Sequence, residues 1–140
     1  MRPASIGGPP APAARRTRVL LVDDDQWVLA SLRRLLERRG YEVAAFLEPA
    51  LALAAVEQGE RFDVLVTDLS MPGLRGSALL AKIGAIDPGL ARRAVVVTGD
   101  LLENAVEELR GAPVRLFAKP PSLDRLFEAI GELAKDGDLR

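Results

Sequence analysis

The sequence predicts an α/β fold, a doubly wound parallel sheet of five strands with helices on both faces. Five short runs of β-branched and aliphatic residues alternate with five stretches whose apolar residues recur at helical spacing. The 140 residues are 49% hydrophobic, which is enough apolar material for one domain with a core. Polar residues stand directly after several of the apolar runs. Because the carboxyl ends of parallel strands share one edge of a sheet, these polar residues are expected to form a site there.

Composition excludes several classes of function. The net charge of -1 gives no basic surplus for binding nucleic acid or acidic lipid. The chain has no cysteine and no histidine, which removes disulfides, Ser-His-Asp chemistry and the usual zinc ligands. No apolar stretch reaches the roughly 20 residues of a membrane span, and the N-terminus lacks the apolar core of a signal peptide. The sequence therefore predicts a soluble cytoplasmic protein without a nucleic-acid or membrane partner.

The predicted domain covers residues 18–135. Residues 1–17 are rich in proline, alanine and glycine and are predicted to be a disordered tail, and residues 136–140 form a short C-terminal tail. Asp25 is the expected N-cap of the first helix, and Gly40 is its expected stop. The first half of the domain is predicted to contain strand, helix, strand and helix in the order 19–22, 27–39, 43–46 and 48–58.

The second half of the domain centres on the predicted strand 64–66. Asp68 lies where this run ends, and Met71-Pro72-Gly73 then forces a turn. A helix over 77–86 is expected to end at Asp87-Pro88-Gly89. The remaining elements are predicted as a strand at 94–97, a helix at 101–110 with Leu102, Val106 and Leu109 on one face, a strand at 114–117 and a helix at 122–134.

Five polar residues follow predicted strands and meet if the first, third, fourth and fifth strands are neighbours. They are Asp23 and Asp24, Asp68, Thr98, and Lys119. Alone, each is typical of a cap or a solvated turn. Together, three carboxylates without histidine or cysteine favour Mg²⁺, and the lysine and hydroxyl suit an anion that carries several charges. This set of groups suits phosphoryl transfer, with Asp68 as a nucleophile that forms an acyl phosphate.

Four segments carry a resemblance to a known family. They are Val-Leu-Leu-Val-Asp23-Asp24, Val-Thr-Asp68-Leu-Ser-Met-Pro72-Gly-Leu-Arg-Gly76, Val-Val-Thr98-Gly and Ala-Lys119-Pro120. Over about residues 18–135 the chain resembles the receiver domain of bacterial two-component response regulators. The resemblance implies a flavodoxin-like (βα)5 fold with strand order 2-1-3-4-5.

The resemblance also implies a metal site and a phosphoacceptor. Asp68 would accept the phosphoryl group. Mg²⁺ would be the cofactor, held by Asp24 directly, by Asp23 through water, by Asp68, and by the main-chain carbonyl of Ser70. Asp25 matches no ligand position.

Two further residues would contact the bound phosphoryl group. Thr98 would donate a hydrogen bond to a phosphoryl oxygen, Lys119 would pair with the group, and the peptide bond before Pro120 would be cis. The resemblance does not extend to Leu116, where many receivers carry an aromatic residue that swings inward, or to Pro121, where phenylalanine is common. Asp100 and Ser70 lie where the family tunes dephosphorylation.

The implied function is that of a phosphoaccepting receiver in a two-component phosphorelay. The donor would be the phosphohistidine of a sensor histidine kinase or of a histidine phosphotransfer protein, because this chain has no histidine. Phosphorylation would shift the fourth and fifth strand–helix units toward binding a downstream protein. The identity of that protein stays open, and so does homodimerisation of this chain. The chain would not be an enzyme beyond its own phosphorylation and dephosphorylation. Its ending resembles receivers that stand alone or belong to hybrid histidine kinases.

Three alternatives compete with this prediction. One is a receiver-like interaction module that is never phosphorylated, although such modules usually lose some of the acids that this chain keeps. Another is a hydrolase of the haloacid dehalogenase type, which needs a second aspartate where this chain has Ser70. The third, a nucleotide-binding enzyme, lacks a glycine-rich phosphate loop after the first strand.

Overall fold

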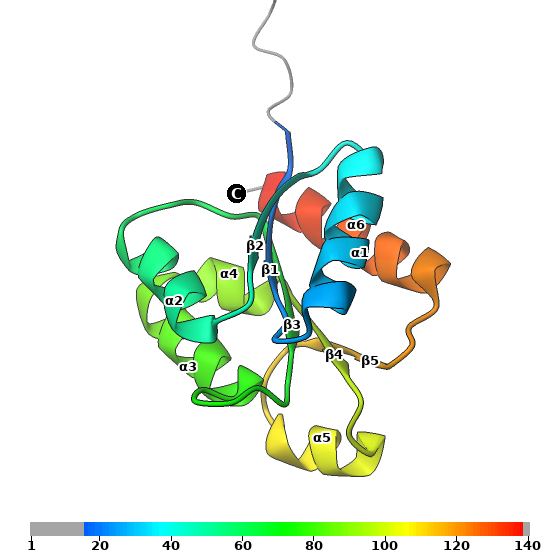
Figure 1. Ribbon diagram of the computed structural model, residues 1–140. Coiled ribbons are helices and arrows are strands. Elements are labelled where there is room, and N and C mark those ends of the chain that lie inside the picture. Colours follow the sequence, from blue (N-terminus) through cyan, green and yellow to red (C-terminus); the bar gives the residue numbers. More distant parts are fainter. Residues whose placement is uncertain (1–15, 139–140) are drawn as a thin grey trace, which may run out of the picture.

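The fold is a five-stranded parallel sheet between two layers of helices (Figure 1). A computed structural model describes residues 16–138, so most of the predicted N-terminal tail lies outside the described residues. The strand order β2-β1-β3-β4-β5 confirms the order expected from the resemblance. The strands are β1 (Arg18–Val22), β2 (Glu42–Phe46), β3 (Val64–Asp68), β4 (Ala94–Thr98) and β5 (Arg115–Ala118).

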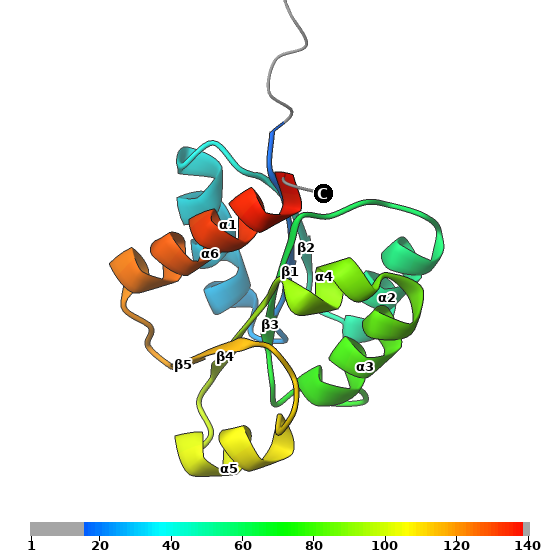
Figure 2. The same ribbon diagram turned by 180° about the vertical axis from the view of Figure 1, so that it is seen from behind.

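Helices cover both faces of the sheet. In Figures 1 and 2, α1 and α6 lie together on one side, and α2, α3 and α4 lie on the other. In both views α5 lies below the sheet, apart from the other helices. The helices are α1 (Gln26–Arg38), α2 (Pro49–Glu57), α3 (Gly76–Ile86), α4 (Pro88–Arg92), α5 (Leu102–Glu108) and α6 (Leu123–Asp138).

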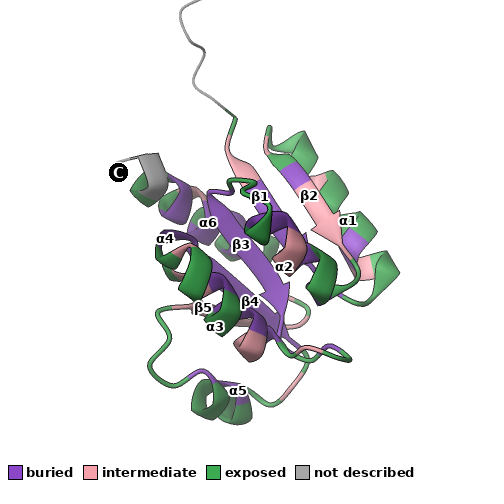
Figure 3. Ribbon diagram, turned by 90° about the vertical axis from the view of Figure 1, so that its left-hand side faces the viewer, coloured by how far each residue is buried: buried purple, intermediate pink, exposed green. Residues whose placement is uncertain are grey.

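The strands divide the core into two clusters. Successive strand side chains point to opposite faces, so Leu20 and Val22 pack beneath α2 and α3, whereas Val19 and Leu21 pack beneath α1 and α6. Both faces are covered, and the central strands are buried along their length (Figure 3). This explains why their sequences are continuous apolar runs and do not alternate with polar residues.

One helix was not predicted. The segment Asp87-Pro88-Gly89 does end α3, but Pro88 also begins the short α4, so the described chain has six helices where the sequence predicts five. The Asp87 side chain caps α4 by accepting a hydrogen bond from the Leu90 N–H at 3.1 Å, and proline suits the first helical position. Leu90 is fully buried, so α4 is anchored by one apolar side chain and a cap.

The apolar face predicted for the helix at 101–110 was wrong for Leu102 and Val106 and right for Leu109. Leu102 and Val106 are 45% and 59% exposed, while Ala105 and Leu109 are buried. α5 faces the core with an arc that includes the small Ala105, because alanine lets the helix backbone approach its neighbours. Helical spacing identifies a period of 3.6 residues, but it does not determine which arc the rest of the molecule covers.

The remaining boundaries differ from prediction by a few residues. Asp25 is confirmed as the N-cap of α1, since its carboxylate accepts hydrogen bonds from Trp27 N–H and Val28 N–H. The last helix ends at Asp138, so it includes residues 136–138, which the sequence assigns to a tail. Within residues 16–138 no helix is both long enough and apolar enough to cross a membrane.

Candidate functional site

The predicted site residues lie together at the carboxyl edge of the sheet. Asp68 and Thr98 are the last residues of β3 and β4, Asp23 and Asp24 follow β1, and Lys119 follows β5. The order β1-β3-β4-β5 makes these strands successive neighbours. The sequence predicts that these side chains meet if the first, third, fourth and fifth strands are neighbours, and the strand order shows that they are.

Lys119 joins the ends of three strands. Its Nζ donates to Asp23 Oδ2 at 2.9 Å and to Asp68 Oδ2 at 3.1 Å, and its backbone N–H donates to the Thr98 carbonyl at 2.8 Å. The Lys119–Pro120 peptide bond is cis, as the resemblance implies. Burial alone would lower the pKa of Lys119, but its bonds to Asp23 and Asp68 raise it above its ordinary value, so the ammonium stays charged.

Asp68 is held in a defined orientation although it is almost completely buried. Only 6% of its surface is exposed. Its Oδ1 accepts hydrogen bonds from the Leu69 N–H at 2.7 Å and the Ser70 N–H at 3.3 Å, while Oδ2 faces Lys119. Backbone and ammonium donors thus fix both oxygens of the predicted nucleophile. The same contact places Ser70 beside the carboxylates, and the role of its carbonyl stays a prediction.

Gly76 lies directly against the backbone of Asp68. A Cβ at this position would be 2.3 Å from the Asp68 carbonyl oxygen and 2.9 Å from Leu69 Cα, which no side chain can tolerate without a shift of the backbone. The Gly76 N–H donates to the Leu69 carbonyl at 2.8 Å. The start of α3 therefore packs directly against the end of β3, and only glycine fits at this contact.

Three carboxylates form a compact acidic cluster. Oxygens of Asp23, Asp24 and Asp68 lie within 4.8 Å of one another. Asp24 is exposed, whereas the other two are buried. Burial raises the pKa of Asp23, against the opposing effects of a 2.9 Å hydrogen bond from the Asp25 N–H and of Lys119. An all-oxygen set with one member open to solvent fits a hard cation such as Mg²⁺, which keeps several waters.

Thr98 is fully buried at the end of β4. Its Oγ1 accepts a hydrogen bond from the Asp100 N–H at 3.0 Å. Because the hydroxyl acts as acceptor in this bond, its own proton remains available for donation to another group. The residue is thus able to play the part that the sequence predicts for it.

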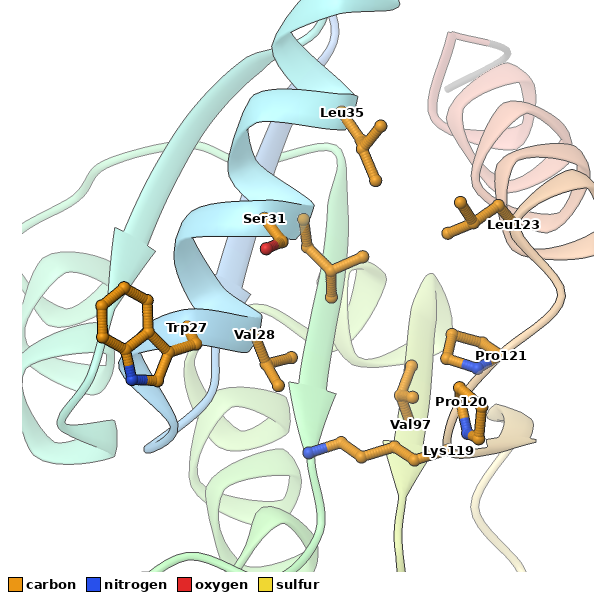
Figure 4. A pocket seen from close by; sticks show the side chains of 10 residues that line it. Trp27, Val28, Ser31, Leu35, Val97, Lys119, Pro120, Pro121 and Leu123 are labelled. Carbon is orange, nitrogen blue, oxygen red and sulfur yellow. The ribbon is translucent and has the colours of Figure 1, made fainter.

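A groove that the sequence did not predict opens beside Lys119 (Figure 4). It has a volume of about 630 Å³. Figure 4 shows Val28 and Leu35 of α1 on one side and Pro120, Pro121 and Leu123 on the other. Trp27, on the rim, is 75% exposed. Val28 and Leu35 are partly buried against the core, and helical spacing alone does not show that their side of α1 also lines an open groove.

Comparison with known proteins identifies relatives over most of the chain. Residues 19–131 match the family model described as "response regulator receiver domain". A response regulator receiver domain protein (CheY-like) from Methanospirillum hungatei is 34% identical with a TM-score of 0.77, and 88% of this chain aligns with 97% of that one. A response regulator receiver domain protein from Clostridium thermocellum has the same TM-score at 29% identity, with 88% and 98% covered.

Curated relatives are longer proteins. The C4-dicarboxylate transport transcriptional regulatory protein DctD of Rhizobium meliloti is 33% identical over 111 residues, which is 79% of this chain and 24% of that protein. The virulence sensor protein BvgS of Bordetella bronchiseptica is 34% identical over 141 residues, which is 90% of this chain and 11% of that protein. The chain thus spans about a quarter or less of the length of these two relatives.

Proposed function

The chain belongs to the response regulator receiver family, and from this premise we propose that Asp68 accepts a phosphoryl group from a phosphohistidine. The donor is a sensor histidine kinase or a histidine phosphotransfer protein. The observation that carries the proposal is the double contact of the Lys119 ammonium with Asp23 and Asp68 at the edge of the sheet. This contact places a positive charge beside a buried carboxylate and next to an acidic cluster. The ammonium would bind a phosphoryl group directly, and the acidic cluster would do so through a bound cation.

In the proposed reaction an Asp68 carboxylate oxygen attacks phosphorus. A P–O bond forms as the P–N bond to the donor imidazole breaks, and the imidazole leaves with the electron pair. The backbone N–H groups of Leu69 and Ser70 orient the carboxylate. Asp23, Asp24, Asp68 and the Ser70 carbonyl would hold Mg²⁺, which supplies charge neutralisation for the phosphoryl oxygens.

Two side chains would stabilise the product. Lys119 exchanges its bond to Asp68 Oδ2 for one to a phosphoryl oxygen, since an ammonium has three donors and can keep its bond to Asp23. The Thr98 hydroxyl donates its free proton to another phosphoryl oxygen. Both residues are anchored, because the Lys119 N–H is bonded to the Thr98 carbonyl.

The test of this function is transfer from a phosphorylated histidine phosphotransfer domain in the presence of Mg²⁺. We expect label to move from the donor to this chain, and we expect EDTA to stop the transfer by removing the cation. Donors of several kinases would be tried, with acetyl phosphate as a small donor. Failure with every protein donor and with acetyl phosphate would contradict the proposal and favour the alternative, an interaction module that is never phosphorylated.

The groove beside Lys119 is the surface that we propose for the donor protein. Trp27, Ser31, Arg34 and Arg38 recur at helical spacing along one exposed side of α1. The apolar groove suits the apolar face of an amphipathic helix, and its end at Lys119 brings such a helix to Asp68.

Substitution in the groove should separate protein donors from small ones. We expect Trp27→Ala to slow transfer from the phosphotransfer domain by about 10-fold, because exposed tryptophans are frequent anchors of interfaces. Acetyl phosphate does not need the groove, so its rate should stay unchanged. Ile86→Ala is a matched control, because Ile86 is a large exposed apolar residue at the far end of α3. Equal slowing with both donors would contradict a docking role.

The setting proposed for this activity is a phosphorelay in the cytoplasm, where histidine kinases use ATP. The relatives include a transcriptional regulatory protein and a sensor protein, and the chain matches only part of each. We propose that this receiver acts through a protein partner, either alone or as part of a hybrid kinase. Its own chemistry is limited to accepting and losing the phosphoryl group.

A further inference from the structure

α5 is held to the molecule by few apolar side chains. Of residues 101–110, only Ala105 and Leu109 are buried. Leu101, Leu102 and Val106 are all exposed, and the helix has only seven residues. Figures 1 and 2 both show α5 standing away from the other helices. With so little apolar area buried, polar links carry a larger share of the free energy that keeps this helix in place.

Arg75 supplies such a link. Its guanidinium donates through Nε to Glu108 Oε2 at 2.9 Å and through Nη2 to Glu108 Oε1 at 2.8 Å, which is a two-pronged ion pair. The same Nη2 contacts Asp100 Oδ2 at 3.4 Å. Arg75 thus contacts the last residue of α5 and a residue just before its start. The hydrogen bond from Arg75 holds the pKa of Glu108 below its usual range, so the pair is charged at neutral pH.

Arg75 is also linked to the proposed phosphoacceptor Asp68 and to Thr98, which would donate to the phosphoryl group. It immediately precedes Gly76, whose backbone is pressed against the Asp68 carbonyl. Its other partner, Asp100, donates its N–H to Thr98 Oγ1 at 3.0 Å. Arg75 is therefore linked to the site in two ways. One link runs from Asp68 through Gly76, and the other runs from Thr98 through Asp100.

We propose that Arg75 is the positioning residue that couples the phosphorylation state of Asp68 to the position of α5. This rests on the proposed function. In this coupling the Thr98 side chain, and not only its proton, moves toward the phosphoryl oxygen, which draws Oγ1 away from the Asp100 N–H and lets Asp100 move. The long contact between Arg75 and Asp100 then breaks, and the start of α5, with its exposed Leu101 and Leu102, is released while Glu108 stays bound.

Hydrogen exchange of residues 101–110 in the whole chain tests the coupling, with and without acetyl phosphate and Mg²⁺. In the wild type, phosphorylation should speed exchange in α5. In unphosphorylated Arg75→Ala, α5 should already exchange about 3- to 5-fold faster, the size expected from losing a surface ion-pair network, and phosphorylation should add little. Phosphoryl incorporation should remain within about 2-fold of wild type, because Arg75 touches none of the reacting groups.

Two further variants make the test specific. Glu108→Gln should also open α5, because it removes the ion pair with Arg75 and weakens the bond that Glu108 accepts from Ser77 Oγ. The double variant should open α5 by less than the sum of the two single changes, since both break the Arg75–Glu108 pair. Arg110→Ala removes the nearby Arg110–Glu107 pair, which makes no contact with the site, and should preserve the response to phosphorylation. An Arg75→Ala protein that keeps the wild-type response would overturn the coupling alone. A wild type that takes up no phosphoryl group would overturn the proposed function and the coupling together.

Discussion

An Asp68→Asn protein is expected to gain no phosphoryl group from acetyl phosphate and Mg²⁺, under conditions in which the wild type gains one. The amide is not a nucleophile that can form the acyl phosphate, and Asp23, which also contacts Lys119, is proposed as a metal ligand and not as an acceptor. In Asp68, Oδ1 is bonded to two backbone N–H groups, and Oδ2 is bonded to Lys119. Intact-protein mass measures the result directly, because each phosphoryl group adds one fixed increment.

The substitution should leave the fold intact. The asparagine Oδ1 can still accept from the Leu69 N–H, and Lys119 keeps its bond to Asp23. Circular dichroism and thermal unfolding check this. Asp124→Asn is the matched control, since it removes an exposed carboxylate at the start of α6 and should be phosphorylated like the wild type. Full phosphorylation of Asp68→Asn would show that another residue is the acceptor.

Gly76→Ala should destabilise the protein more than alanine at Gly84, Gly99 or Gly131, where an added Cβ would meet no packed neighbour closer than 3.4 Å. The Cβ added at Gly76 would meet the Asp68 carbonyl oxygen at 2.3 Å, and because both groups are backbone, neither can move aside as a side chain would. We expect the free energy of unfolding to fall by about 2–3 kcal/mol, the upper part of the range for overpacking. Urea unfolding measures it. Since the shift occurs at Asp68, phosphorylation should slow as well, in the fraction that is folded.

Gly131→Ala separates this contact from the general effect of adding a methyl group to a glycine. Gly131 lies within α6, and its nearest neighbour would be the Tyr41 hydroxyl at 3.8 Å, an ordinary contact. Alanine favours helix over glycine, so this variant should be more stable by about 0.5–1 kcal/mol. Equal stability of Gly76→Ala and the wild type would mean that the close approach of α3 to β3 is not a constraint.

Much of the fold and most of the site could be predicted from local sequence patterns and from one general rule, which is that the carboxyl ends of parallel strands share one edge of the sheet. The apolar runs at 19–22, 64–66 and 94–97 are continuous since both faces of those strands are buried, and their alternation with helical stretches favours a parallel sheet between two layers of helices. Once the sheet is parallel, its strand ends must share an edge. Asp23, Asp68 and Lys119 meet for that reason, although up to 96 residues separate them in sequence.

Other features could not be predicted because they depend on which surfaces the finished fold covers. The arc of α5 that faces the core contains Ala105, and the open groove is lined by Val28 and Leu35, residues whose spacing alone is that of a buried face. The contact between Arg75 and Glu108 joins two charged surface residues 33 positions apart. No periodicity or motif indicates such a pair, since it arises only from the packing of α5 beside the loop after β3.

The most direct measurement is to locate the phosphoryl group after reaction with acetyl phosphate and Mg²⁺. Borohydride reduces an acyl phosphate of aspartate to homoserine, and peptide mass spectrometry then identifies the modified position. The proposed chemistry predicts homoserine at position 68 and at no other aspartate. Homoserine at Asp23, Asp24 or Asp100, or a phosphoryl group on a hydroxyl that borohydride leaves unchanged, would contradict the assignment of Asp68 as the acceptor.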